Sequence, residues 1–226
     1  VQNMNRAKKN LATYTYSEST GKWNTSNALY WGVQPTNTFN AWYPATSAYN
    51  SFTIPTDQTA GTATADWMTA TTTANRANGV VNLSFNHNLA KVTITIDEWN
   101  NEYLESERVI SLLELSSLSG VNSLSSVMPN NNTAMWVKAY EKEENTSFVA
   151  IIAPGTYTSG KDIMQVYVNG SSTPLAVKTK EALTLEASKA YSFKLKVGKD
   201  LATITSSVTV GDWGDVDLDN QNATQQ

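Results

Sequence analysis

The chain has 226 residues, enough to bury one large hydrophobic core or two ordinary ones. It has no Cys and one His, which excludes disulfide frameworks, thiolate metal sites and metal sites that need two His ligands. Its 16 Lys and Arg against 20 Asp and Glu give a net charge of −4, which disfavours nucleic acid, because phosphates bind basic surfaces.

The polar residues of this chain are of an unusual kind. Ser, Thr and Asn make up roughly a third of the sequence, whereas charged residues make up only 16%. Thr favours strands, and Asn and Ser favour turns because their side chains bond to nearby backbone groups. This composition predicts an extracellular β-protein. The sequence shows neither an apolar run of membrane-spanning length nor an N-terminal signal pattern.

The first half of the sequence predicts short strands separated by turns. Residues 13–31 form two candidate strands around a turn, and residues 39–43 alternate in polarity until Pro44 ends the strand. Residues 61–78, rich in Thr and Ala, are interpreted as a long loop. Residues 81–96 alternate on both sides of a change of phase near residue 89, which predicts a β-bulge or a tight turn.

The second half gives clearer strand signals. Residues 97–108 are the only stretch with a helix-like pattern. Residues 148–152 are apolar at every position, which predicts a central strand covered on both faces. Asn169-Gly170 predicts a hairpin turn, and residues 190–210 predict a hairpin with one apolar and one polar face.

These signals predict an all-β protein made of two β-sandwich domains in tandem. A charged segment around residues 98–108 separates two blocks of strands, so we place the boundary near residue 104. The N-terminal domain would span residues 1–104 and lack its first strand. The C-terminal domain would span residues 105–226 and end in an acidic tail.

No group of residues in the sequence has the pattern of a catalytic site. His87 lies between Phe85 and Leu89 on the inward side of a predicted strand, and no triad motif surrounds it, so we expect a partly buried His that hydrogen-bonds to a neighbouring strand. The tail run Asp215-x-Asp217-x-Asp219 resembles the start of a calcium loop, but it lacks the required Gly and the closing Glu. The expectation is a protein that is not an enzyme, with no metal or cofactor.

The seven Trp residues are the other candidates for function. Trp is usually buried, but strand alternation places Trp42 and Trp136 on the face opposite to the predicted core, so they are the best candidates for exposed Trp. They are candidate platforms on which sugar rings stack. A carbohydrate-binding surface module is therefore an alternative function, and a glycoside hydrolase ranks third because sequence cannot place two carboxylates across a cleft.

Several motifs together resemble one family. Residues 39–44 (FNAWYP), 51–58 (SFTIPTDQ), 66–70 (DWMTA), 83–92 (LSFNHNLAKV) and 208–213 (VTVGDW) are similar in order and spacing to landmarks of the fimbrillin-like proteins. These are type V pilins and related surface lipoproteins of Gram-negative anaerobes. The resemblance covers nearly the whole chain.

The resemblance implies two transthyretin-like Greek-key β-sandwich domains and a place at the cell surface, in the outer membrane or a fimbrium. It also implies export through a lipoprotein signal peptide, absent from this chain, so the membrane would be contacted only through a lipid anchor on the precursor. The implied function is a non-catalytic structural or accessory subunit of a fimbria, serving adhesion. Its partners would be other pilin subunits, in a homo- or hetero-polymer, and a host glycan or protein. Subunits would join by strand addition.

The same resemblance implies two functional segments. In polymerising members a protease specific for Arg or Lys removes a first strand, and Arg6-Ala7 is the candidate cleavage site, with Val1–Met4 as the end of that strand. The alternative is an ordinary basic loop. For the donor strand we choose the C-terminal tail at residues 216–226, with Val216 and Leu218 as its apolar residues. That tail is polar after Leu218, which favours an anchor or tip subunit about as much as a stalk subunit.

Overall fold

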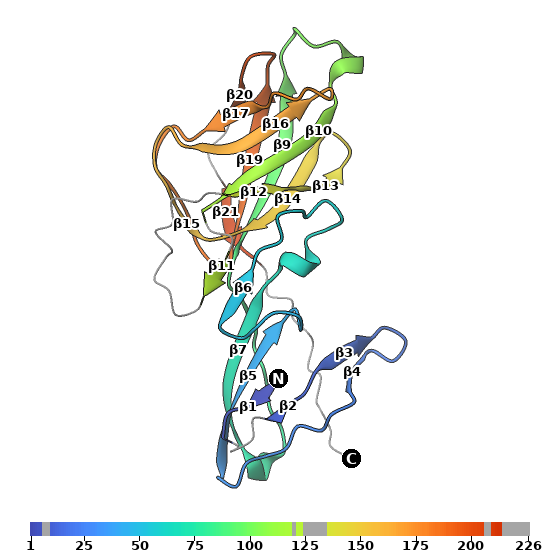
Figure 1. Cartoon of the computed structure of the whole chain (residues 1–226), viewed down its shortest axis with the longest axis vertical. Helices are drawn as coiled ribbons and strands as arrows, with labels where there is room; N and C mark the ends of the chain where they lie inside the picture. Colours follow the sequence, from blue (N-terminus) through green and yellow to red (C-terminus); the bar gives the residue numbers. More distant parts are fainter. Residues whose placement is uncertain (6–9, 119–120, 124–134, 206–208, 214–226) are drawn as a thin grey trace. The chain divides into compact units, whose positions relative to one another are not determined.

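The computed structural model describes residues 1–5, 10–118, 121–123, 135–205 and 209–213, which form strands joined by turns (Figure 1). Three short 3-10 helices interrupt them: η1 (Ala63–Ala65), η2 (Arg76–Asn78) and η3 (Glu105–Glu107). The predicted all-β fold class is confirmed. No helix within the described ranges is long and apolar enough to cross a membrane.

The chain divides into two compact units, each assembled from separate stretches of sequence. Unit 1 draws its described residues from 1–49 and 67–86, and unit 2 draws its residues from 50–66 and 87–213. The sequence predicted one boundary near residue 104, whereas the structure divides the chain at several points. The physical reason is that β9 (Ala90–Trp99) pairs with strands of the later sequence, so it belongs to unit 2.

Unit 1 is built on a sheet with the strand order β2-β1-β5-β7-β8. These strands are β1 (Gln2–Asn3), β2 (Asn10–Leu11), β5 (Thr36–Tyr43), β7 (Met68–Asn75) and β8 (Asn86–His87). The long strands β5 and β7 pair antiparallel over all eight residues. A separate hairpin consists of β3 (Tyr14–Ser17) and β4 (Lys22–Thr25).

Unit 2 contains two larger sheets. One has the order β13-β14-β9-β19-β20, with β21 also on β19, and its strands besides β9 are β13 (Tyr140–Glu143), β14 (Ser147–Ile152), β19 (Lys189–Val197), β20 (Ala202–Ile204) and β21 (Thr209–Asp212). The other has the order β12-β10-β16-β17, with β12 (Met135–Lys138), β10 (Ile110–Ser117), β16 (Asp162–Val168) and β17 (Leu175–Lys178). Two short pairs complete unit 2: β6 (Ser51–Thr53) with β11 (Val121–Ser123), and β15 (Gly155–Tyr157) with β18 (Leu183–Leu185).

The two large sheets of unit 2 bury their side chains in a common core. Val92 and Phe193 from one sheet and Leu115 and Met164 from the other line the same small internal hollow. Every residue of β14 is buried, and the strand lies between β13 and β9 in its sheet, so its side chains are covered on both faces. The central strand predicted for residues 148–152 is confirmed.

The structure confirms the turn and the strand end that were predicted from a few adjacent residues, but it differs from two of the longer predicted segments. Asn169 and Gly170 both have positive φ and follow β16, and β16 pairs antiparallel with β17, as the dipeptide predicts. β5 ends directly before Pro44. By contrast, the strand predicted over residues 81–89 is present only as β8, and residues 97–108 contain the end of β9 and η3 in place of a longer helix.

Gln58 is a buried side chain that completes a sheet edge in unit 2. Its Nε2 donates to the Ile151 carbonyl at 2.8 Å, and the Ile151 N–H donates to Gln58 Oε1 at 2.9 Å. On this side of β14 the neighbouring strand β13 begins at Tyr140, opposite Val149. The amide of Gln58 therefore takes the place of a strand residue opposite Ile151.

We expect Gln58→Ala to lower the free energy of unfolding by about 2–4 kcal/mol, because it leaves two buried backbone groups of Ile151 unpaired. Urea denaturation measures this loss. The control is Gln34→Ala, which changes an exposed Gln and should cost no more than about 0.5 kcal/mol. Equal losses in the two variants would contradict the assigned role of Gln58.

Candidate functional site

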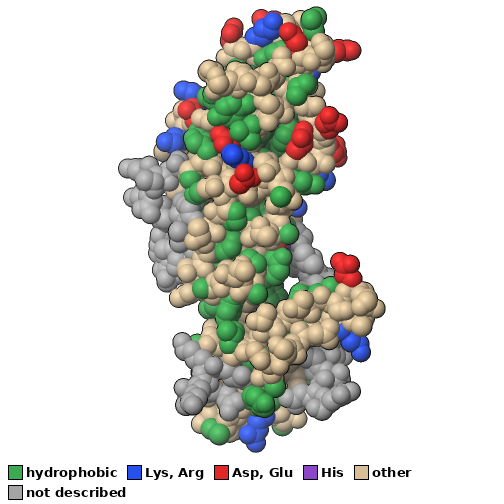
Figure 2. Space-filling model, turned by 45° about the vertical axis from the view of Figure 1, so that its right-hand side comes forward, with side chains coloured by type: hydrophobic (Ala, Val, Ile, Leu, Met, Phe, Trp, Pro, Cys, Tyr) green, Lys and Arg blue, Asp and Glu red, His purple; other side chains and the backbone are tan. Residues whose placement is uncertain are grey.

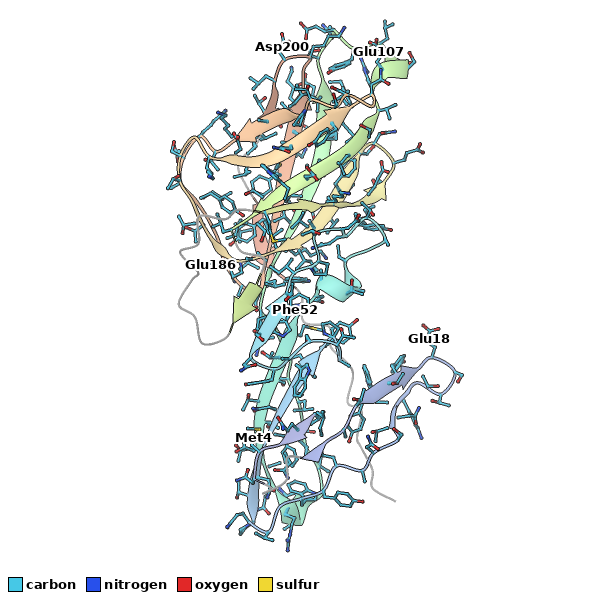
Figure 3. The ribbon with its side chains drawn as sticks, viewed as in Figure 1. Met4, Glu18, Phe52, Glu107, Glu186 and Asp200 are labelled. Atoms are coloured by element: carbon cyan, nitrogen blue, oxygen red, sulfur yellow. The ribbon has the colours of Figure 1, made fainter. Side chains whose placement is uncertain are left out.

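The candidate site of unit 1 is β5, whose two edges are paired to different extents. On one edge β7 pairs with all eight residues of β5. On the other edge β1 pairs only with Phe39 and Asn40, and the Met4 N–H donates to the Thr38 carbonyl at 2.9 Å (Figure 3). Ala41, Trp42 and Tyr43 of β5 thus extend beyond its pairing with β1.

Backbone alternation identifies which groups of β5 face this second edge. The Thr38 carbonyl bonds to Met4, so the N–H and C=O groups of Thr38, Asn40 and Trp42 point to the side of β1. Within the described residues, no strand pairs with Trp42 on that side. Trp42 therefore presents backbone N–H and C=O groups at an edge that no strand of the described ranges pairs with.

A buried amide network holds β1 on β5. Asn3 and Asn37 are both fully buried, and Asn3 Nδ2 donates to Asn37 Oδ1 at 2.8 Å and to the Tyr30 carbonyl at 3.0 Å. Asn37 Oδ1 also accepts from the Gly32 N–H at 2.6 Å, and Asn37 Nδ2 donates to the Gln34 carbonyl at 2.9 Å. Because β1 has only two strand residues, these side-chain bonds are a large part of what attaches it.

The two faces of β5 differ in chemistry. Phe39 and Ala41 are buried on the inner face, where Trp31 packs edge-on against Phe39 with ring centroids 5.2 Å apart. Trp42 lies on the outer face, opposite the core residues of β5, and is half-buried. Its Nε1 donates to the Ser47 carbonyl at 3.0 Å, and its ring meets Tyr49 edge-on at 6.3 Å.

His87 forms a structural cluster in unit 2. It is 3% exposed, and its Nδ1 lies 2.6 Å from Asp66 Oδ1. Its ring stacks on Trp213 with centroids 4.0 Å apart and planes 7° apart, and Lys91 Nζ lies 5.9 Å from the centre of the same Trp ring. The expected burial of His87 is confirmed, although its side-chain partner is a carboxylate. Asp66 lies in the motif at residues 66–70, His87 and Lys91 lie in the motif at residues 83–92, and Trp213 lies in the motif at residues 208–213.

Of the other candidate residues from the sequence, one is described by the structure and four are not. Trp136 is described and half-buried in β12, next to the buried Val137. Arg6, Ala7, Val216 and Leu218 lie outside the described residues. No group of three or more metal-binding side chains occurs in the described ranges.

Sequence reasoning missed the polar residues that organise the site. Asn3 and Asn37 look like ordinary surface amides in a chain rich in Asn. The available signal was the spacing of Asn37, Phe39 and Ala41, which places Asn37 on the buried parity of β5.

Three solved structures share the fold over most of this chain. A candidate cell adhesion protein from Bacteroides uniformis has 19% identity and a TM-score of 0.64, covering 89% of this chain and 84% of that one. A second, from Bacteroides ovatus, has 18% identity and a TM-score of 0.53, covering 84% and 75%. The C-terminally truncated tip fimbrial protein Mfa3 from Porphyromonas gingivalis has 12% identity and a TM-score of 0.52, covering 89% and 93%.

A comparison with the curated proteins finds no significant match. The model of the family described as fimbrillin-like, by contrast, matches residues 2–213, which include every described strand and all the motifs noted above. The chain therefore belongs to the fimbrillin-like family, a structural and non-catalytic family of fimbrial proteins.

Proposed function

We propose that the chain is a structural or accessory subunit of a cell-surface fimbria, joined to neighbouring subunits by strand addition and serving adhesion. Membership in a fimbrial family already implies the cell surface and association with other pilus subunits. The observation that supports strand addition is the edge of β5, where β1 covers only Phe39 and Asn40 and Trp42 has no strand partner in the described part of the chain.

An added strand would stabilise unit 1, because the hydrophobic core of this unit is small. Among its described residues, the buried apolar side chains include two large ones, Phe39 and Trp67, beside the small Ala12, Ala41 and Ala70. An added strand supplies backbone partners along the edge and side chains for this thin core at the same time. In this proposal the two units are transthyretin-like Greek-key sandwiches in tandem, and unit 1 is completed by a neighbour. Because donor and acceptor surfaces differ, such joints build an open filament.

Cleavage after Arg6 would prepare this edge. In the sequence Arg6 lies between β1 and β2, so a cut there leaves β1 attached through non-covalent contacts alone. These contacts include the short pairing with β5 and β2, the Met4–Thr38 hydrogen bond and the Asn3–Asn37 network. The cut would allow β1 to leave and a longer strand to replace it.

The rest of the proposal follows the family resemblance. We assign the donor strand to residues 216–226, with Val216 and Leu218 as its apolar side chains. Partners are copies of this chain or other pilin subunits, in a stalk, anchor or tip position. The precursor would carry a lipoprotein signal peptide and reach the outer membrane through a lipid anchor.

We expect treatment of the chain with an Arg-specific protease to produce polymers, seen as ladders on unboiled gels and as fibres by electron microscopy. Arg6→Ala should abolish them, because β1 then stays covalently attached. Arg76→Ala, which changes an exposed Arg in η2, should leave them unaffected. Equal polymerisation of Arg6→Ala and the parent chain would refute Arg6 as the processing site. Monomers after complete cleavage at Arg6 would refute strand addition.

The network that holds β1 gives a second test. Asn37→Ala removes the acceptor for Asn3 and Gly32, so we expect the amide of Asn40 to exchange hydrogen about tenfold faster or more, as β1 opens locally. Asn78→Ala, which changes an exposed Asn of η2, is the matched control. Unchanged exchange at Asn40 in Asn37→Ala would show that β1 is held by other contacts.

A further inference from the structure

The outer face of the β5–β7 pair is lined by hydroxyl and amide side chains. Register and alternation place Thr38 opposite Thr73, Asn40 opposite Thr71, and Trp42 opposite Thr69 on this face. We call the set the threonine face; it comprises Thr36, Thr38, Asn40 and Trp42 of β5 and Thr69, Thr71, Thr73 and Asn75 of β7. Trp42 is its one apolar member.

The polar groups of this face are ordered and available. Thr71 Oγ1 donates to Asn40 Oδ1 at 3.1 Å, and the hydroxyls of Thr38 and Thr73 lie 3.5 Å apart. Thr71 and Thr73 are exposed, and Asn40 is half-buried. The Nδ2 of Asn40 has no acceptor within the described ranges, and the exposed hydroxyls of Thr71 and Thr73 keep unused donor or acceptor capacity. The face thus presents fixed hydrogen-bonding groups to solvent.

Trp42 ends this row with an aromatic ring held in one orientation. Its Nε1 bond to the Ser47 carbonyl and its edge contact with Tyr49 fix the indole, and the Tyr49 hydroxyl is itself hydrogen-bonded to Thr71 Oγ1. From Trp42 to Thr36 the face extends for about 20 Å along the strand. A platform for C–H groups therefore adjoins a row of partners for hydroxyls.

The electrical neutrality of this face narrows the class of ligand. In the described part of unit 1 the charged residues are Glu18 at the tip of the β3–β4 hairpin, Lys22 in β4 and Arg76 in η2, and none of them belongs to the face (Figure 3). Figure 2 shows that charged side chains gather over the strands of unit 2 instead. Anionic ligands require cationic partners, and protein docking sites need a larger apolar centre than one Trp.

We propose that the threonine face binds a neutral glycan, with one sugar ring stacked on Trp42 and its hydroxyls bonded to Asn40, Thr71 and Thr73. A sugar ring combines apolar C–H faces with equatorial hydroxyls, which is the combination this surface offers. The proposal deepens the adhesive role proposed above by naming the ligand class. It uses a face of β5, whereas strand addition uses an edge, so the two can be tested separately.

The experiment measures glycan binding by the monomeric, uncleaved chain. An array of neutral and sialylated oligosaccharides identifies ligands, and calorimetry with the best neutral oligosaccharide gives its affinity. The test variant is Thr71→Val combined with Thr73→Val, which removes two exposed hydroxyls but keeps β-branched side chains. The matched control is Thr156→Val with Thr184→Val, an exposed cross-strand Thr pair of unit 2 whose hydroxyls lie 2.9 Å apart.

We expect binding of at least one neutral oligosaccharide, with little dependence on salt. The Thr71/Thr73 variant should lose about tenfold in affinity or more, and the Thr156/Thr184 variant should keep the parent affinity. Circular dichroism checks that both variants fold. Binding confined to sialylated glycans, no binding at all, or equal affinity in the two variants would overturn the glycan proposal. None of these results would affect the polymerisation test, which reports on the edge of β5.

Discussion

The pairing of β5 is the constraint on which unit 1 depends, because each side of this strand has a different environment. One edge is paired with β7 along its whole length, and the other is paired with β1 at two residues, where the buried side chains of Asn3 and Asn37 hold β1 in place. The inner face supplies Phe39 and Ala41 to a small core, and the outer face is polar. The strand is therefore fully paired on one edge and only partly paired on the other within the described residues.

The parts of the fold that sequence predicts well are those encoded locally. A fully apolar run predicted the central strand β14, and Asn169-Gly170 predicted the turn after β16, because each signal depends only on neighbouring residues. The parity of β5 likewise placed Trp42 on the face opposite the core. Alternation and turn chemistry are properties of a few adjacent residues, so they can be recognised in the sequence without knowing which strands pair.

The parts that sequence does not predict depend on partners far apart in the chain. Asn3 and Asn37 are 34 residues apart, and Gln58 and Ile151 are 93 residues apart, yet each pair is buried and bonded. A polar side chain is normally assigned to the surface, and no periodicity shows which Asn or Gln is the exception. The predicted domain boundary near residue 104 differs from the observed division for the same reason. β9 pairs in parallel with β19, whose sequence lies about a hundred residues later.

Trp42 connects the two proposed surfaces, since its backbone lies on the edge of β5 that no strand of the described ranges covers and its ring lies on the outer face. A strand added at that edge would bond to the backbone of Trp42, while the ring, already held by Ser47 and Tyr49, would stay on the outer face. A filament built by strand addition would also repeat the outer face once per subunit. Repeated weak sites on one fibre bind a glycan-covered surface with far greater avidity than a single site does, so strand addition and glycan binding at β5 would reinforce each other.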